Sequence, residues 1–288
     1  MAGALEELVE LLDLEELEVN IFRGRSPRDA RERVFGGQVA AQALVAAGRT
    51  VPFDRRPHSL HCYFLRPGDV GSPIVYFVDR IRDGRSFATR RVVAIQHGEA
   101  IFNMSASFQV AEEGLRHQMP APAAPDPESL PTFAERARRM FGERAPLWID
   151  RRRAIDMRWC EPANWRPAVG EPPEQRVWMR ADGRLPDDPA VHRAVFVYAS
   201  DYTLTETVMR PHGVHWMDGG VFSASLDHAI WFYEDARADE WWLYVQDSPA
   251  AAGARGLARG TIYSRDGRLI CAVTQEVLLR VAGRRAEV

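Results

Sequence analysis

Residues 90–105, RRVVAIQHGEAIFNMS, align without a gap with residues 259–274, RGTIYSRDGRLICAVT. Each stretch consists of two runs of alternating apolar and polar residues, interrupted at Gly98 or Gly267 beside a charged residue. This pattern predicts two antiparallel strands joined by a tight turn. Because the pattern occurs once in each half of the chain, it predicts a duplicated fold.

The sequence before each stretch follows the same order of one apolar segment, two strand-like runs and a turn. In the first half these lie at residues 37–48, 59–64, 74–77 and 83–84. In the second half they lie at residues 191–209, 225–230, 242–245 and around 253. We therefore predict one helix and four strands in each half.

The segment from Gly37 to Gly48 carries alanine at positions 40, 41, 43, 46 and 47. Little bulk remains on any face, so we expect this helix to be surrounded by other structure rather than to lie on the surface. The strand-like runs, such as residues 269–277, are long enough to curl around such a helix. The sequence predicts an α+β fold made of two curved antiparallel sheets, each wrapped around one central helix.

A proline-rich stretch separates the two halves. Residues 117–131 carry five prolines amid alanines, a composition that favours extended, solvated chain. We predict an N-terminal domain at residues 1–116, a linker at 117–131 and a C-terminal domain at 132–288.

The composition excludes several classes of protein. The 288 residues are 46% hydrophobic, and 37 basic and 40 acidic residues are well mixed at a net charge of −3, so no global field would attract nucleic acid. No run approaches the roughly 18 apolar residues that cross a bilayer. Three widely spaced cysteines indicate neither a disulfide framework nor a zinc site. The acidic N-terminal segment at residues 5–12 does not resemble a secretion signal, so we expect a cytoplasmic protein.

Seven short motifs occur in a specific order across the chain. They are VFGGQ at 34–38, FLRPG at 64–68, RDGRSF at 82–87, ASDY at 199–202, SLDH at 225–228 with Trp231 and Phe232, ARG at 254–256 and VTQE at 273–276. Their order resembles the acyl-CoA thioesterase II family, whose members are two fused hotdog folds. The resemblance implies hydrolysis of a fatty acyl-CoA to free acid and coenzyme A in lipid metabolism. It also implies a homo-oligomer, either a dimer or a tetramer, and no cofactor.

The resemblance further implies three site residues around an attacking water. They are Asp201 on the central helix of the second half, Ser225 at the start of the next strand and Gln275 on the last strand. Many relatives carry threonine where this chain has Ser225, and serine keeps the hydroxyl. In the first half Ser59 is matched to Ser225, but Ala106 takes the place of Gln275 and the helix offers no acid, so one site per chain is expected.

Taken alone, each of these residues also has an ordinary structural interpretation. An aspartate in an apolar helix is usually exposed or caps the helix, since burial of a charge is unfavourable. Ser225 could lie at a strand edge, and Gln275 could be a solvated strand residue. The amides near Gly36 and Gly37 could contact a carbonyl or a phosphate, because a helix N-terminus favours negative charge.

Other side chains are more simply explained by structure. We expect His212 and His228 to be structural histidines, and Asp227 and His228 to diverge because adjacent strand residues point to opposite faces. Five neighbouring aromatic residues are better explained as core or subunit contact than as an acyl pocket. They are Trp231, Phe232, Tyr233, Trp241 and Trp242.

Alternative functions require features that differ from those of this sequence. A double-hotdog enoyl-CoA hydratase, which needs an aspartate and a histidine five residues apart near a helix start, is the nearest enzymatic alternative. A serine hydrolase needs a Gly-x-Ser-x-Gly elbow, which is absent from the sequence. Cys62 beside His61 could form an acyl-enzyme, but the two side chains would diverge on a strand. A non-catalytic acyl-CoA binding protein with a drifted site remains the alternative from another class.

Overall fold

The computed structural model describes residues 3–27, 33–142, 149, 151–162, 168–215 and 220–282. The helices are α1 (Ala4–Leu12), α2 (Gly36–Gly48), α3 (Phe133–Phe141), α4 (Pro189–Ser200) and α5 (Leu204–Met209), with 3₁₀ turns η1 (Pro127–Ser129) and η4 (Arg210–His212). The first-half strands are β1 (Glu15–Glu18), β2 (Ile21–Gly24), β3 (Arg55–Phe64), β4 (Ile74–Asp83), β5 (Phe87–Gln96) and β6 (Glu99–Val110). The second-half strands are β7 (Ile155–Trp159), β8 (Glu174–Ala181), β9 (Val221–Ser225), β10 (Asp227–Phe232), β11 (Trp242–Ala252), β12 (Arg255–Ser264) and β13 (Leu269–Val281).

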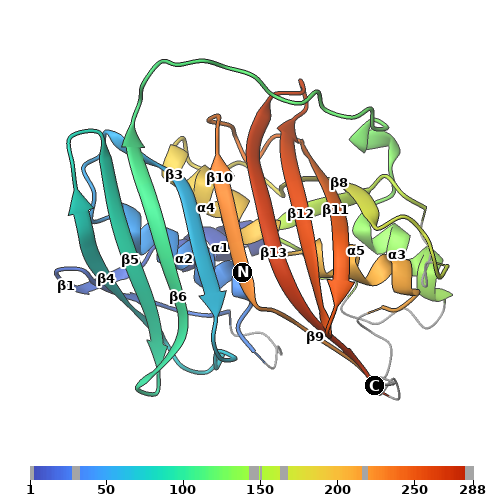
Figure 1. The fold of residues 1–288 in the computed structure, drawn as a ribbon, viewed down its shortest axis with the longest axis horizontal. Coiled ribbons are helices and arrows are strands. Elements are labelled where there is room, and N and C mark those ends of the chain that lie inside the picture. Colours follow the sequence, from blue (N-terminus) through green and yellow to red (C-terminus); the bar gives the residue numbers. More distant parts are fainter. Residues whose placement is uncertain are drawn as a thin grey trace.

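All described strands belong to one antiparallel sheet (Figure 1). Its order is β1-β2-β4-β5-β6-β3-β10-β13-β12-β11-β8-β7, with β9 added alongside β13. The first six and the last six strands follow the same order read outward from the β3–β10 pair. This pair joins the two halves at the centre of the sheet. The predicted duplication and the α+β double hotdog fold are confirmed.

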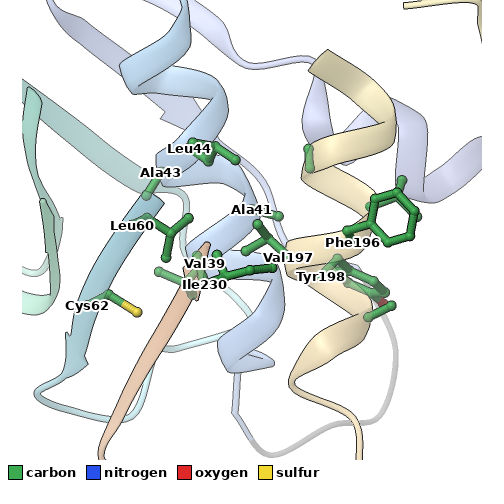
Figure 2. Packing of buried hydrophobic residues seen from close by; sticks show 14 of the residues in the cluster. Val39, Ala41, Ala43, Leu44, Leu60, Cys62, Phe196, Val197, Tyr198 and Ile230 are labelled. Carbon is green, nitrogen blue, oxygen red and sulfur yellow. The ribbon is translucent and has the colours of Figure 1, made fainter. Parts of the chain in front are cut away.

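The central helices α2 and α4 lie side by side on one face of the sheet (Figure 1). All five alanines of α2 are at most 1% exposed, as expected for a helix that is surrounded. Figure 2 shows Val39, Leu60 and Ile230 gathered where α2 meets β3 and β10. Small side chains let α2 approach both the sheet and α4, and this close approach forms the core between the two halves.

The predicted turns occur at the predicted glycines. His97 and Gly98 join β5 to β6 with φ values of 51° and 78°, the pair of positive values that a tight hairpin turn requires. Gly267 has a φ of 86° between β12 and β13. The two glycines mark the turns of both hairpins, a two-residue turn in the first half and a four-residue turn at residues 265–268 in the second.

The strand register corrects one prediction about the first half. Ser225 pairs with Val277, which aligns with Phe108, and Phe108 pairs with Pro57. Pro57 therefore takes the position of Ser225, and Ser59 corresponds to Asp227. The match of Ser59 to Ser225 is wrong because each half has an irregularity here, a bulge in β3 and the break between β9 and β10. Since proline has no hydroxyl, the first half lacks this hydrogen-bonding group.

Residues 111–126, which include the first part of the predicted linker 117–131, run over the second half without helix or strand, and η1 follows within the linker. Gln118 donates to the carbonyl of Gly267 at 2.8 Å and accepts from the amide of Leu269 at 3.0 Å. The indole of Trp178 donates to the carbonyl of Pro125 at 2.8 Å. These contacts hold the segment against the sheet, while the predicted domain bounds stay a prediction. No helix among the described ranges is long and apolar enough to cross a membrane.

Candidate active site

Asp201 lies at the break between two helices of the second half. The apolar segment 191–209 forms α4 and α5 rather than one helix, and Asp201 caps the C-terminal end of α4. It therefore follows the central helix instead of lying on it. The side chain is buried, at 8% exposed. Burial at the negative end of a helix dipole is unfavourable for a carboxylate, so other groups must stabilise its charge.

The first half supplies one of these groups. The backbone N–H of Gly37, in the first turn of α2, donates to Asp201 Oδ2 at 2.9 Å. An unpaired N–H at a helix N-terminus is favourable for an anion. The helix-start amide considered for a carbonyl or phosphate contact thus binds the carboxylate of Asp201. The site is built from both halves of the chain.

Ser225 and Gln275 lie next to Asp201 because β9 and β13 are paired. Ser225, the last residue of β9 rather than the first of the following strand, lies opposite Val277. Its hydroxyl donates to Asp201 Oδ1 at 3.0 Å, and Gln275 Nε2 donates to the same hydroxyl oxygen at 2.9 Å. The structure brings the three predicted side chains into one chain of hydrogen bonds. Their catalytic role stays a prediction.

His228 extends this chain of hydrogen bonds, which the sequence analysis missed. Its Nδ1 lies 2.6 Å from Gln275 Oε1, and its Nε2 lies 2.9 Å from the hydroxyl of Ser200. The ring is 1% exposed. Asp227 points away, as strand alternation predicted, and accepts from the amide of Glu276 at 2.6 Å. The sequence signal that could have identified His228 was the alternation of buried and less buried residues along β10, because His228 shares the buried face with Ile230.

The environment of Asp201 changes its acidity. Burial raises the pKa of Asp201, and the electrostatic influence of His228 and the hydrogen bonds from Ser225, Gln275 and Gly37 oppose that increase. The net direction is upward. A carboxylate with a raised pKa is a stronger base whenever the solution pH lies above that pKa.

Aromatic rings surround the carboxylate. Phe35 contacts the rings of Tyr202 and Tyr198 at centroid distances of 4.8 and 5.2 Å, and the two tyrosine hydroxyls are 3.0 Å apart. A Cβ added at Gly36 would lie 2.8 Å from the ring of Phe64 and 2.9 Å from Asp201 Oδ2. Phe35, Phe64 and Tyr202 lie within the quoted motifs VFGGQ, FLRPG and ASDY, but the sequence assigned these rings no role.

The five neighbouring aromatic residues at positions 231–242, which the sequence analysis described, lie in the core or on the surface. Trp242, Trp241 and Phe232 are at most 9% exposed and belong to the core. Trp231 packs edge-on against His61, and Tyr233 is 60% exposed. This arrangement agrees with a structural explanation of the cluster.

The cysteine alternative does not fit the geometry. Cys62 is 2% exposed, and its thiol donates to the backbone carbonyl of His228 at 3.1 Å. Burial raises the pKa of the Cys62 thiol well above its usual range. His61 is exposed on the other face of β3 and cannot act as its base. In the described part of the chain, no three His, Cys, Asp or Glu residues are grouped to hold a metal ion.

Fold and site together define a double hotdog protein with a buried polar site between its halves, and comparisons with known proteins specify the family. Residues 25–109 match the model of the acyl-CoA thioesterase N-terminal domain, and residues 150–278 match that of acyl-CoA thioesterase. Human acyl-coenzyme A thioesterase 8 is 40% identical over 282 residues, covering 94% of this chain and 88% of that protein. Acyl-CoA thioesterase 2 of Haemophilus influenzae is 38% identical over 283 residues, covering 97% and 99%.

A solved structure gives the same result. The acyl-CoA thioesterase II TesB2 of Mycobacterium marinum is 45% identical, covers 96% of this chain and 99% of its own, and has a TM-score of 0.80. The chain belongs to the acyl-CoA thioesterase II family, so the resemblance seen in the motifs is confirmed.

Proposed function

We propose that this thioesterase hydrolyses fatty acyl-CoA to free fatty acid and coenzyme A with a water that Asp201, Ser225 and Gln275 hold and activate. The observation that carries the proposal is the unbroken chain of hydrogen bonds from Gly37 through Asp201 and Ser225 to Gln275. A buried carboxylate is unfavourable unless it is paired, so its presence beside the donors Gly37, Ser225 and Gln275 favours a chemical role.

The geometry supports a simple reaction sequence. Asp201 accepts from Gly37 on Oδ2 and from Ser225 on Oδ1, Gln275 adds a further hydrogen bond, and the carboxylate keeps acceptor capacity for a water. Asp201 takes a proton from this water while the water oxygen forms a bond to the thioester carbonyl carbon. The carbonyl oxygen becomes an oxyanion, which hydrogen-bond donors in the site must stabilise. The C–S bond then breaks as the carbonyl re-forms. Asp201 returns its proton to the leaving coenzyme A thiolate, which departs as the thiol.

A chain-length series tests the activity directly. Purified protein is incubated with acyl-CoAs from short to long chain, and the released thiol is measured. We expect steady release with at least one chain length. Tight binding of every acyl-CoA without release would instead support the non-catalytic binding protein.

On the acid side of the pH profile, activity should fall at a pH above the usual pKa of an aspartate. Activity requires ionised Asp201, and burial raises the pKa of this carboxyl, so kcat/KM should fall as pH decreases through a value higher than about 3.9. The measurement is kcat/KM against pH under conditions where the protein stays folded. A profile that remains flat down to pH 4 would contradict the role of Asp201 as base.

Ser225 provides a matched pair of variants. Ser225→Ala removes the hydroxyl that donates to Asp201 and accepts from Gln275, and we expect kcat to fall by about 10- to 100-fold, since one positioned hydrogen bond is lost. Ser225→Thr keeps the hydroxyl and adds a methyl, so its kcat should stay within a few-fold of the parent. Equal losses in both variants would show that packing rather than the hydroxyl matters at this position.

The physiological setting is an expectation of the same proposal. We expect a cytoplasmic homo-oligomer, a dimer or a tetramer, in fatty-acid metabolism, without a cofactor. Light scattering coupled to size-exclusion chromatography determines the number of chains.

A further inference from the structure

His228 is held rigidly between the two central strands and helix α4. It belongs to β10, where its backbone pairs with Cys62 of β3. On the other side, the hydroxyl of Ser200 contacts its Nε2, and the carbonyl of Ser200 accepts from the fully buried Tyr244 at 3.1 Å. The imidazole therefore has a fixed orientation toward Gln275.

Counting protons assigns the donors in this network. Gln275 Oε1 can only accept, so the hydrogen between it and His228 must be on Nδ1. The hydroxyl of Ser200 also lies 3.0 Å from the carbonyl of Val197, which can only accept as well. Since Ser200 has one proton and gives it to Val197, Nε2 donates to Ser200 when every bond is made. All contacts are satisfied when both ring nitrogens carry hydrogen.

The orientation of the Gln275 amide depends on this donor. With Oε1 turned toward His228, the amide N–H groups face Ser225, and the Ser225 proton is free for Asp201. A flipped amide would present its oxygen to Ser225. The one proton of Ser225 could not then serve both Gln275 and Asp201, and the hydrogen-bond chain would break.

We propose that His228 is a positioning residue that fixes the Gln275 amide so that its N–H groups point toward Ser225 and the attacking water. This inference rests on the proposed thioesterase function but does not place His228 in contact with substrate. Its effect passes through one atom, Nδ1, which makes it testable by substitutions that replace one ring nitrogen at a time.

Substitution of His228 by asparagine or by glutamine tests the roles of its two ring nitrogens separately. In His228→Asn the side-chain amide nitrogen can take the place of Nδ1 and keep the donor to Gln275. In His228→Gln the amide lies near the position of Nε2, so the contact with Ser200 is retained and the donor to Gln275 is lost. We expect kcat to stay within about fivefold in the asparagine variant, and to fall roughly 10- to 100-fold with little change in KM in the glutamine variant. The opposite ranking would overturn the proposal.

The Gln275→Ala variant, used as a second background, distinguishes a positioning role of His228 from an effect on folding. In Gln275→Ala there is no amide to orient, so adding His228→Gln should change kcat by less than about twofold. If His228→Gln lowers kcat by the same factor in both backgrounds, His228 acts by another route and the proposal is wrong. Thermal unfolding of each variant identifies losses that come from misfolding alone.

Nitrogen NMR tests the donor without any turnover. In protein labelled with ¹⁵N-histidine, the His228 signals are those that disappear in His228→Asn. We expect Nδ1 of the parent protein to be protonated, and an unprotonated Nδ1 would refute the positioning role. Because this readout needs no substrate, failure of the positioning role can be distinguished from failure of the proposed activity, which the chain-length series measures separately.

Discussion

Asp201→Asn is expected to lower kcat/KM by about 10²–10⁴ on any acyl-CoA that the parent protein hydrolyses, the loss typical of a positioned general base. Asparagine keeps the shape of the side chain. Its oxygen can accept from the amide of Gly37, and its nitrogen can donate to the hydroxyl of Ser225, which is free to rotate. The variant thus removes the base while the surrounding hydrogen bonds persist.

The same substitution should leave the protein as stable as the parent near neutral pH, or more stable. Burial raises the pKa of Asp201, so the folded state binds this proton more tightly than the unfolded state does. The associated stability is present below the unfolded pKa of about 3.9 and is lost as pH rises through the folded pKa. Asparagine has no such loss, and the difference in unfolding temperature between variant and parent should shrink as pH decreases toward 4.

Calorimetry gives the unfolding temperature of the Asp201→Asn variant, and thiol release measured on the same samples gives its activity. Reduced activity with equal or higher stability assigns Asp201 to function rather than to folding. An Asp201→Asn variant that hydrolyses acyl-CoA at the parental rate would falsify the proposed base, though not the proposed activity. A variant that loses both activity and stability would indicate that the carboxylate mainly holds α2 against α4.

The fold was predictable because its signals are local and repeated. Alternation around Gly98 and Gly267 specifies two hairpins, and a glycine with positive φ is needed at each turn. The alanines of α2 indicate a helix without an exposed face, and the sheet and α4 together cover it. Duplication then relates one half to the other, so the double hotdog architecture follows from local patterns that occur twice in the chain.

The site was predictable only as a set of residues from the family resemblance. That Asp201 follows α4 instead of lying within it depends on where the helix meets α5, which the continuous apolar segment did not reveal. The contact with Gly37 joins residues 164 positions apart, and the link between His228 and Gln275 depends on the register of β10 against β13. No local pattern encodes such pairings, since they arise when the two halves pack together.

Gly37→Ala is expected to destabilise the protein by about 1–3 kcal/mol, the usual range for an overpacked core. A Cβ at Gly37 would lie 2.4 Å from the backbone carbonyl oxygen of Tyr198 and 2.6 Å from the ring of Phe35. A backbone carbonyl cannot rotate out of the way as a side chain can, so α2 and α4 must separate. The N–H of Gly37 then moves away from Asp201, and a displacement of about 1 Å at a reacting group can lower the rate by roughly 10²-fold.

Gly48→Ala is the matched control, because Gly48 ends the same helix and an added Cβ there meets no atom within 4 Å. This substitution should leave kcat unchanged and stabilise the protein by up to about 1 kcal/mol, since alanine favours helix over the unfolded chain. Activity is compared well below both unfolding temperatures, so that loss of folded protein does not contribute. If Gly37→Ala is destabilised but hydrolyses acyl-CoA at the parental rate at this lower temperature, the glycine serves only the packing of the two helices. If kcat falls while Gly48→Ala stays active, the contact between the first-half helix and Asp201 is needed for hydrolysis, and the two halves form a single catalytic unit.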